Sequence, residues 1–303
     1  MDARSNFTRP ARLAAIAPYA WMVLFFLVPF GFVLKLSLSQ TTIAQPPYLP
    51  ILDLGAGWQA LADAASMFSL DNFRLLLSDS LYLSAGLRSL TVAAAATAML
   101  LLVGYPIAYA MSRLPHRWQP FAMMLVIVPF WTSFLIRVYA WINILQHDGL
   151  LNQILLTLHV VSAPVVWLST DTAMYIGMVY SYLPFMILPL FATLSKLDDA
   201  LLEAAADLGS SPLQSFWLVT FPLSLPGIGA GVLLCFIPLV GEFVIPDLLA
   251  GSDALMIGQI LWLEFFTNRD WPVAAATAVL LLLILLVPLL IYDRFQRRQM
   301  VRP

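Results

Sequence analysis

Long apolar stretches alternate with short polar ones along the whole chain. A transmembrane α-helix needs about 20 consecutive, mostly apolar residues to cross the hydrocarbon core of a bilayer. Six stretches reach that length, which predicts an all-α integral membrane protein with six transmembrane helices. We place these helices in a single transmembrane domain over 1–303, at residues 13–35, 85–111, 120–145, 172–194, 225–248 and 272–292.

The composition supports this interpretation. Hydrophobic residues make up 61% of the 303 positions and charged residues 11%, whereas soluble domains carry about 25% charged residues. A water-soluble class of protein is therefore excluded. The first apolar stretch exceeds the roughly 7–15 residues of a signal-peptide core, so we expect it to remain as an uncleaved first span.

The distribution of positive charge predicts the orientation of the chain. Cytoplasmic loops of membrane proteins carry an excess of Lys and Arg. If the N-terminus is cytoplasmic, ten of the 15 Lys and Arg residues lie on the cytoplasmic side. Both termini are then cytoplasmic, segment 36–84 is periplasmic and loop 196–224 is cytoplasmic.

Segment 36–84 is the longest connection between predicted spans. Its sequence SLDNFRLLL predicts a short helix, because Ser69 or Asp71 can accept hydrogen bonds from the free backbone N–H groups at the start. Two interpretations of the whole segment stay open: a solvated connector, or a lid or docking surface.

The chain shows no catalytic or metal-binding constellation in its sequence. His116, His147 and His159 lack metal-ligand spacing, and the single cysteine, Cys235, excludes a Cys-based site. Neither lysine stands in a phosphate-binding loop. We therefore predict no catalytic residues, no metal and no cofactor in this chain, and an energised pump would need a partner to hydrolyse ATP.

Loop 196–224 interrupts the apolar pattern with a two-part helical signal. Asp198 or Asp199 can cap a first helix, and Gly209 suits the left-handed residue that follows a helix end. Ser211 followed by Pro212 is a second helix start. We expect this second helix to end before Pro222.

The residues of this loop are distributed over distinct faces. Glu203 and Asp207, four residues apart, place two negative charges on one face of the first helix. Leu213, Phe216 and Trp217 form an apolar stripe on the second helix. The stripe either packs against the chain's own spans or fills a cleft on another protein, and the pattern favours neither.

This loop resembles the EAA signature of the permease subunits of bacterial ABC importers. Glu203-Ala204-Ala205 is followed by Gly209 at the family's spacing, while Val219 and Phe221-Pro222 stand where the family has Ile and Leu-Pro. In that family the loop seats in a groove of the ATPase subunit. The resemblance implies that the ATPase-coupling residues are Glu203, Ala204, Ala205, Asp207, Gly209, Pro212, Phe216 and Pro222.

Longer strings, among them LIRVYAWINIL, GEFVIPDLLAG and EFFTNRDWPVA, are similar to the polyamine (putrescine/spermidine) permeases of that family. The resemblance implies a type I importer permease with the MetI-like fold, located in the bacterial inner membrane. It also implies a second, related permease subunit, a periplasmic polyamine-binding protein, and two ATPase subunits that bind ATP and Mg²⁺.

A polyamine is a flexible polycation, so its pathway should offer carboxylates and aromatic faces. Glu242 follows an apolar run, where a charge is costly unless it faces a cavity or a partner; a structural ion pair with Arg137 is the alternative. The candidate pathway residues are Glu242, Asp247, Asp171, Tyr180, Tyr182, Trp131, Tyr139 and Phe243. Trp and Tyr also mark membrane interfaces, which is the other interpretation of Tyr139.

Three other functions compete with polyamine import. The substrate could be another small organic cation or an amino-acid-derived solute. A secondary transporter driven by an ion gradient would need no coupling loop, so the EAA-like stretch argues against it. A membrane enzyme would need a catalytic constellation, and the sequence offers none.

Overall fold

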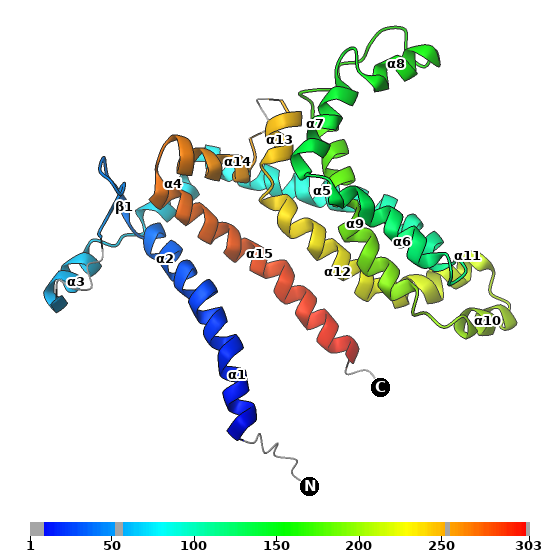
Figure 1. Ribbon diagram of the computed structural model, residues 1–303, viewed down its shortest axis with the longest axis horizontal. Coiled ribbons are helices and arrows are strands. Elements are labelled where there is room, and N and C mark those ends of the chain that lie inside the picture. Colours follow the sequence, from blue (N-terminus) through cyan, green and yellow to red (C-terminus); the bar gives the residue numbers. More distant parts are fainter. Residues whose placement is uncertain (1–8, 52–56, 252–254, 301–303) are drawn as a thin grey trace. The chain divides into compact units, whose positions relative to one another are not determined.

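The computed structural model describes residues 9–51, 57–251 and 255–300, and these are mostly helical (Figure 1). The sequence predicts a single domain, but the described residues cluster into two compact units. The first combines parts of Met1–Leu83 with Leu261–Leu283, and the second combines Ser84–Ile260 with parts of Ile284–Pro303.

Five helical segments of the described chain are long and apolar enough to cross a membrane: Ile16–Ser37, Ser80–Ser112, Asp171–Leu194, Pro212–Val240 and Trp271–Arg294. They are built from α1 (Arg9–Met22), the π-helical turn η1 (Val23–Leu27), α2 (Val28–Ser37), α5 (Ser80–Ser112), α9 (Asp171–Leu194), α11 (Pro212–Ser215), the π-helical turn η3 (Phe216–Thr220), α12 (Phe221–Val240) and α15 (Trp271–Met300). Each segment contains or overlaps one of the stretches predicted as spans.

The stretch predicted as the third span, 120–145, is not one straight helix. It comprises α6 (Gln119–Ile127), a 3₁₀ turn η2 (Val128–Trp131) and α7 (Phe134–Leu145). The helical segments on the two sides of this break, Gln119–Trp131 and Phe134–Thr157, are bent by 89°. Pro129 lacks a backbone donor, and the chain is extended at Thr132, so the helical hydrogen-bond ladder stops there.

The first unit folds the connection 36–84 into ordered structure. It contains β1 (Gln40–Thr41) and β2 (Tyr48–Leu49), paired antiparallel with Gln40 opposite Leu49, followed by α3 (Gly57–Ser66) and α4 (Asp71–Ser78). The Ser69 hydroxyl accepts a hydrogen bond from Asp71 N at 3.4 Å, as predicted for the start of the short helix, although Leu70 occupies the N-cap position.

Several contacts attach this connection to the rest of the first unit, including the π-helical turn η4 (Leu263–Thr267). The Tyr82 hydroxyl donates to Glu264 Oε1 at 2.8 Å, and the Thr41 hydroxyl donates to Asp270 Oδ1 at 2.5 Å. The Asn72 amide donates to the backbone carbonyls of Ser37 and Ser39. The described part of the connection is therefore packed structure rather than a loose linker.

The core of the second unit is the packing of α9 against α12, which lie side by side (Figure 1). Small residues let their backbones approach closely, as in other membrane helix pairs. A Cβ atom added at Gly231 would lie 2.7 Å from Met186 Sδ, and one added at Gly227 would lie 2.6 Å from Thr193 Oγ1. These glycines thus set the spacing of the two helices.

The stretch predicted as the fifth span, 225–248, is also divided. Helix α12 ends at Val240, and a separate short helix α13 (Val244–Leu249) follows after Gly241–Phe243. Helix α13 packs against both α7 and α9. The remaining helices are α8 (Leu150–Thr157), α10 (Ala200–Asp207) and α14 (Ile257–Trp262).

Candidate functional sites

The two-part helix between α9 and α12 has the local structure that its sequence predicts. Helix α10 ends in a left-handed glycine: Gly209 has φ of +85°. Gly209 N donates to Ala206 O at 2.8 Å and Ser210 N to Ala205 O at 3.0 Å, the paired bonds of a Schellman motif. The last carbonyls of α10 are thereby satisfied, and the chain turns sharply.

The second part begins with a reciprocal cap. The Ser211 hydroxyl accepts from Gln214 N at 3.4 Å, and Gln214 Oε1 accepts from Ser211 N at 2.9 Å. This is a capping box, with Pro212 in the first turn as expected. At the start of α10, Asp198 Oδ1 accepts from Ala200 N at 3.0 Å, so Asp198 rather than Asp199 makes the side-chain cap.

The prediction that the second helix ends before Pro222 is wrong. Helix α11 continues through η3 into α12, and Pro212–Val240 is a single helical segment of 29 residues. The wider π-helical turn of η3 shifts the backbone hydrogen bonds immediately before Pro222, which lies in the first turn of α12. A proline at that position needs no donor.

The apolar stripe of the second helix is divided between two roles. The Phe216 ring packs edge-on against Tyr105 and Tyr109 of α5, with ring centroids 5.8 Å apart in each pair. Leu213 and Trp217 instead remain exposed. Phe216 therefore anchors the loop to the chain's own span, while Leu213 and Trp217 stay available to another protein.

Polar contacts complete this anchor. Arg113, just beyond the end of α5, forms an ion pair with Asp199 at 2.7 Å. The hydroxyls of Tyr105 and Ser224 lie 3.0 Å apart in a buried hydrogen bond. The loop is thus attached to α5 at both of its ends, which gives it a fixed position relative to the spans.

The outer surface of the loop combines apolar and acidic groups. We call it the loop surface and define it by its exposed residues Leu201, Glu203, Ala204, Asp207, Leu208, Leu213, Trp217 and Leu218. Leu208 is 88% exposed, the largest exposure of any leucine in the described residues. Among the described residues, neither Glu203 nor Asp207 forms an ion pair.

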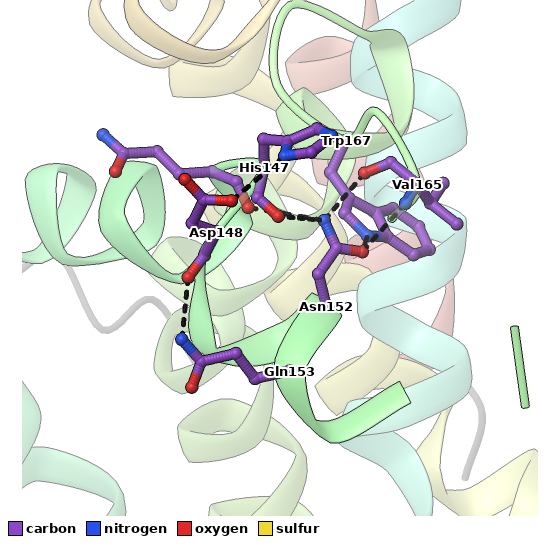
Figure 2. Close-up of polar contacts among 7 residues, drawn as sticks. His147, Asp148, Asn152, Gln153, Val165 and Trp167 are labelled. Atoms are coloured by element: carbon purple, nitrogen blue, oxygen red, sulfur yellow. Dashed lines mark hydrogen bonds and ion pairs between the residues drawn. The ribbon is translucent and has the colours of Figure 1, made fainter. Parts of the chain in front are cut away.

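A second ordered element lies in the connection between α7 and α9, where a buried asparagine holds a bent loop together (Figure 2). The Asn152 amide nitrogen donates to the carbonyls of Gln146, His147 and Val165 at 3.4, 3.1 and 2.9 Å. Its oxygen accepts from Val165 N and Trp167 Nε1, both at 3.0 Å. The sequence analysis missed this residue, although a lone Asn in the apolar run LLNQILL was a visible signal.

Glu242 is buried and acts first as a helix cap. Its carboxylate accepts hydrogen bonds from Val244 N at 3.0 Å and Ile245 N at 3.4 Å, which satisfies the free donors of α13. The Tyr182 hydroxyl of α9 donates to the same carboxylate. The described residues contain no Glu242–Arg137 ion pair, so the alternative expected for Glu242 is wrong in this conformation.

The other candidate pathway residues occupy different surroundings. Asp171 forms an ion pair with Arg88 at 2.6 Å, and Thr170 rather than Asp171 caps α9. Trp131 lines a groove of about 540 Å³ together with Met123 and Phe191. Asp247 and Tyr139 are exposed, and Phe243 is partly buried at the start of α13.

Tyr180 and Tyr182, two residues apart on α9, differ in their partners. Tyr182 reaches Glu242, whereas Tyr180 packs edge-on against Trp141 with ring centroids 5.4 Å apart. Tyr180 is 37% exposed.

Within the described residues, no group of three or more His, Cys, Asp or Glu side chains could hold a metal ion.

Five apolar helices long enough to span a bilayer, one further apolar pair of helices bent at a break, and the exposed loop surface define a multi-pass membrane subunit of the transporter-permease class. A family model described as "Binding-protein-dependent transport system inner membrane component" matches residues 92–301, more than half of the chain. The chain belongs to this family. It is a transport subunit of the inner membrane.

Two relatives are similar over nearly their whole length. The "Spermidine/putrescine transport system permease protein PotB" of Escherichia coli K12 is 42% identical over 254 residues, which cover 82% of this chain and 92% of that one. The protein of the same name from Haemophilus influenzae is 36% identical over 276 residues, covering 91% and 90%.

A solved structure confirms the fold. A chain of a bacterial ABC transporter involved in the import of the acidic polysaccharide alginate aligns with a TM-score of 0.66, at 17% identity. The alignment covers 96% of each chain. At that identity the likeness shows the fold of an ABC importer permease and says nothing of the substrate.

Proposed function

We propose that this chain is a permease subunit of an ATP-driven importer that moves putrescine, spermidine or both from periplasm to cytoplasm by alternating access. The 42% identity to a spermidine/putrescine permease over most of both chains carries the substrate assignment. A small organic cation or amino-acid derivative is the nearest alternative substrate.

The loop surface supports the ATP-driven part of the proposal. It presents exposed leucines and a tryptophan beside the unpaired acids Glu203 and Asp207, on a loop held to α5 by Phe216 and Arg113. We propose that two ATPase subunits bind ATP and Mg²⁺, and that one receives this surface in an apolar groove with basic groups at its edge. Gly209 and Pro212 shape the corner that presents it.

The orientation follows from the same proposal. The loop surface must face the cytoplasm to meet an ATPase, which agrees with the excess of Lys and Arg assigned to that side. A periplasmic binding protein would deliver the polyamine, and a second, related permease subunit would complete the pathway. Of the pathway candidates, the exposed Asp247 and Tyr139 are the better contacts for the solute, since Glu242 and Tyr182 bind each other.

The test is uptake of labelled putrescine and spermidine by cells that lack their own polyamine importers. The chain is supplied together with the partners encoded beside it, with either an active or a hydrolysis-deficient ATPase subunit. We expect uptake with the active ATPase and none with the deficient one. Uptake that survives loss of hydrolysis would overturn the ATP-driven proposal, and an assembled complex that takes up neither polyamine would overturn the substrate.

A further inference from the structure

Two opposite charges are buried in the second compact unit without a counter-charge. Arg137 and Glu242 are each 8% exposed. Nε and Nη1 of Arg137 are inaccessible and have no hydrogen-bond partner. Among the described residues, the donors to Glu242 are neutral: the Tyr182 hydroxyl and the backbone N–H groups of Val244 and Ile245.

This arrangement is energetically unfavourable for each charge taken separately. A buried charge loses its hydration, and only an opposite charge with good geometry offsets that loss. The chain buries both groups by itself, so a neighbouring subunit is not needed to explain their low exposure. Within this unit, the natural counter-charge for Arg137 is Glu242, because Arg137 lies on α7 and Glu242 caps the start of α13, the helix that packs against α7.

A row of aromatic rings connects the two groups. The Arg137 guanidinium lies over the Phe130 ring, 4.4 Å from its centroid. The Phe130 ring contacts Phe185 edge-on at 5.4 Å, and Phe185 lies 6.1 Å from Tyr182, which donates to Glu242. Neutral side chains thus link the cation to the anion in the conformation seen here.

Both charges also lie beside a break in a span. Arg137 stands at the end of the first turn of α7, directly after the 89° bend. Glu242 stands between the end of α12 at Val240 and the start of α13 at Val244. Breaks of this kind absorb changes in backbone dihedral angles during domain motions, while the helices beside them stay intact.

We propose that Arg137 and Glu242 form a buried ion pair in a second conformation of the transport cycle, and that Tyr182 holds Glu242 away from Arg137 in the present one. The breaks before α7 and before α13 supply the motion, and the rings of Phe130 and Tyr182 move aside. The Glu242 carboxylate then exchanges a hydroxyl donor for a guanidinium. This inference rests on the proposed function, because it requires a transporter that alternates between two states.

A double-mutant cycle on the whole importer tests the pairing. Arg137→Gln and Glu242→Gln each leave one buried charge alone in the paired state, so each should lower polyamine uptake about tenfold or more. Arg137→Gln/Glu242→Gln removes both charges and should lose less activity than either single variant. If the two groups never form a pair, the fractional losses of uptake in the two single variants should multiply in the double variant. That result would overturn the proposal. The Gln side chain keeps an oxygen for the cap of α13.

Cysteine cross-linking tests the geometry directly. The variant Arg137→Cys/Glu242→Cys, with Cys235→Ala to remove the native thiol, is treated in the nucleotide-free and vanadate-trapped importer with a bifunctional thiol reagent whose reach matches the Cβ separation of a paired arginine and carboxylate. A disulfide would be too short for that separation. We expect a cross-link in one state and little in the other. The pair Arg88→Cys/Asp171→Cys replaces an arginine and a carboxylate that already form an ion pair, with Nη2 and Oδ1 2.6 Å apart, and is the control for the reagent. No Arg137–Glu242 cross-link in either state, with the control cross-linked, would overturn the proposal.

These experiments distinguish failure of the proposed function from failure of the ion-pair proposal. If the unaltered importer takes up neither polyamine, the substrate assignment is wrong, whereas the cross-linking result still reports on the pair. If the unaltered importer transports a polyamine and the cycle is multiplicative, the transport proposal stands and the ion pair does not.

Discussion

At the scale of single residues, side chains that satisfy the backbone decide the shape of the connections. Asn152 makes five hydrogen bonds from one amide and holds the turns on both sides of α8 (Figure 2). Glu242 does the same for the start of α13. Each of these two side chains takes the place of water as the hydrogen-bond partner of backbone groups.

We expect Asn152→Ala to loosen the connection between α7 and α9. The substitution removes the part-buried hydrogen bonds that Asn152 makes to three carbonyls, one backbone N–H and one indole N–H, at roughly 0.5–1.5 kcal/mol for each bond. Limited proteolysis of the purified importer should show faster cleavage within 146–167. The neighbouring Gln153→Ala removes only an exposed hydrogen bond to Asp148 O and serves as the control. Equal cleavage of the two variants would contradict a clamping role for Asn152.

At the scale of elements, the loop between α9 and α12 shows how far a sequence predicts structure. Its caps and its glycine corner depend on neighbouring residues, and the sequence predicted them from Gly209, Ser211 and Pro212 alone. The inward turn of Phe216 depends on Tyr105 and Tyr109, more than 100 positions earlier. Local patterns carry no information on such a contact.

The same reasoning applies to the spans. Their number and approximate positions followed from apolar length, because a bilayer imposes that length on any helix that crosses it. The apolar pattern did not predict the break at Thr132 or the end of α12 at Val240. Twelve prolines lie inside the predicted spans, and only tertiary packing determines which of them interrupts a helix.

The loop surface predicts a charge-reversal effect. Glu203→Lys should reduce co-purification of the ATPase subunits about tenfold, because it places a cation where we propose that the ATPase groove is basic. Asp148→Lys makes the same change on a carboxylate whose side chain is 99% exposed, on the connection between α7 and α9, and should have no effect. Pull-down from solubilised membranes measures both. Undiminished recovery with Glu203→Lys would remove this residue from the coupling surface.

The α9–α12 contact predicts a packing effect. Gly231→Val places a side chain against Met186 and should destabilise the protein by roughly 1–3 kcal/mol through overpacking. A second substitution, Met186→Ala, should restore part of the loss. Gly31→Val is the control, since a Cβ at Gly31 has no neighbour within 4 Å. Thermal unfolding of the detergent-purified protein reports the result, and a Gly231→Val protein as stable as the control would contradict this packing.

At the scale of the whole molecule, the orientation in the membrane decides which partners each surface can meet. The excess of Lys and Arg places both termini and the loop surface on the cytoplasmic side. The connection around Asn152 then faces the periplasm. This arrangement is the one that an importer with an external binding protein and an internal ATPase requires.

Labelling of single cysteines checks the orientation in a Cys235→Ala background. A membrane-impermeant maleimide should label Ala163→Cys in whole cells with a permeabilised outer membrane, because residue 163 is exposed on the predicted periplasmic side. Asp207→Cys should react only after the inner membrane is opened. The reverse pattern of labelling would invert the topology and remove the loop from reach of a cytoplasmic ATPase.

The uninterrupted helical segment Pro212–Val240 has a mechanical consequence. At about 1.5 Å per residue, its 29 residues make a rod of roughly 40 Å. One end carries the loop surface, and the other ends beside Glu242, the cap of α13. The segment stays helical through the π-helical turn η3 and through Pro226 and Pro238, so one continuous helix connects the loop surface to the cap of α13.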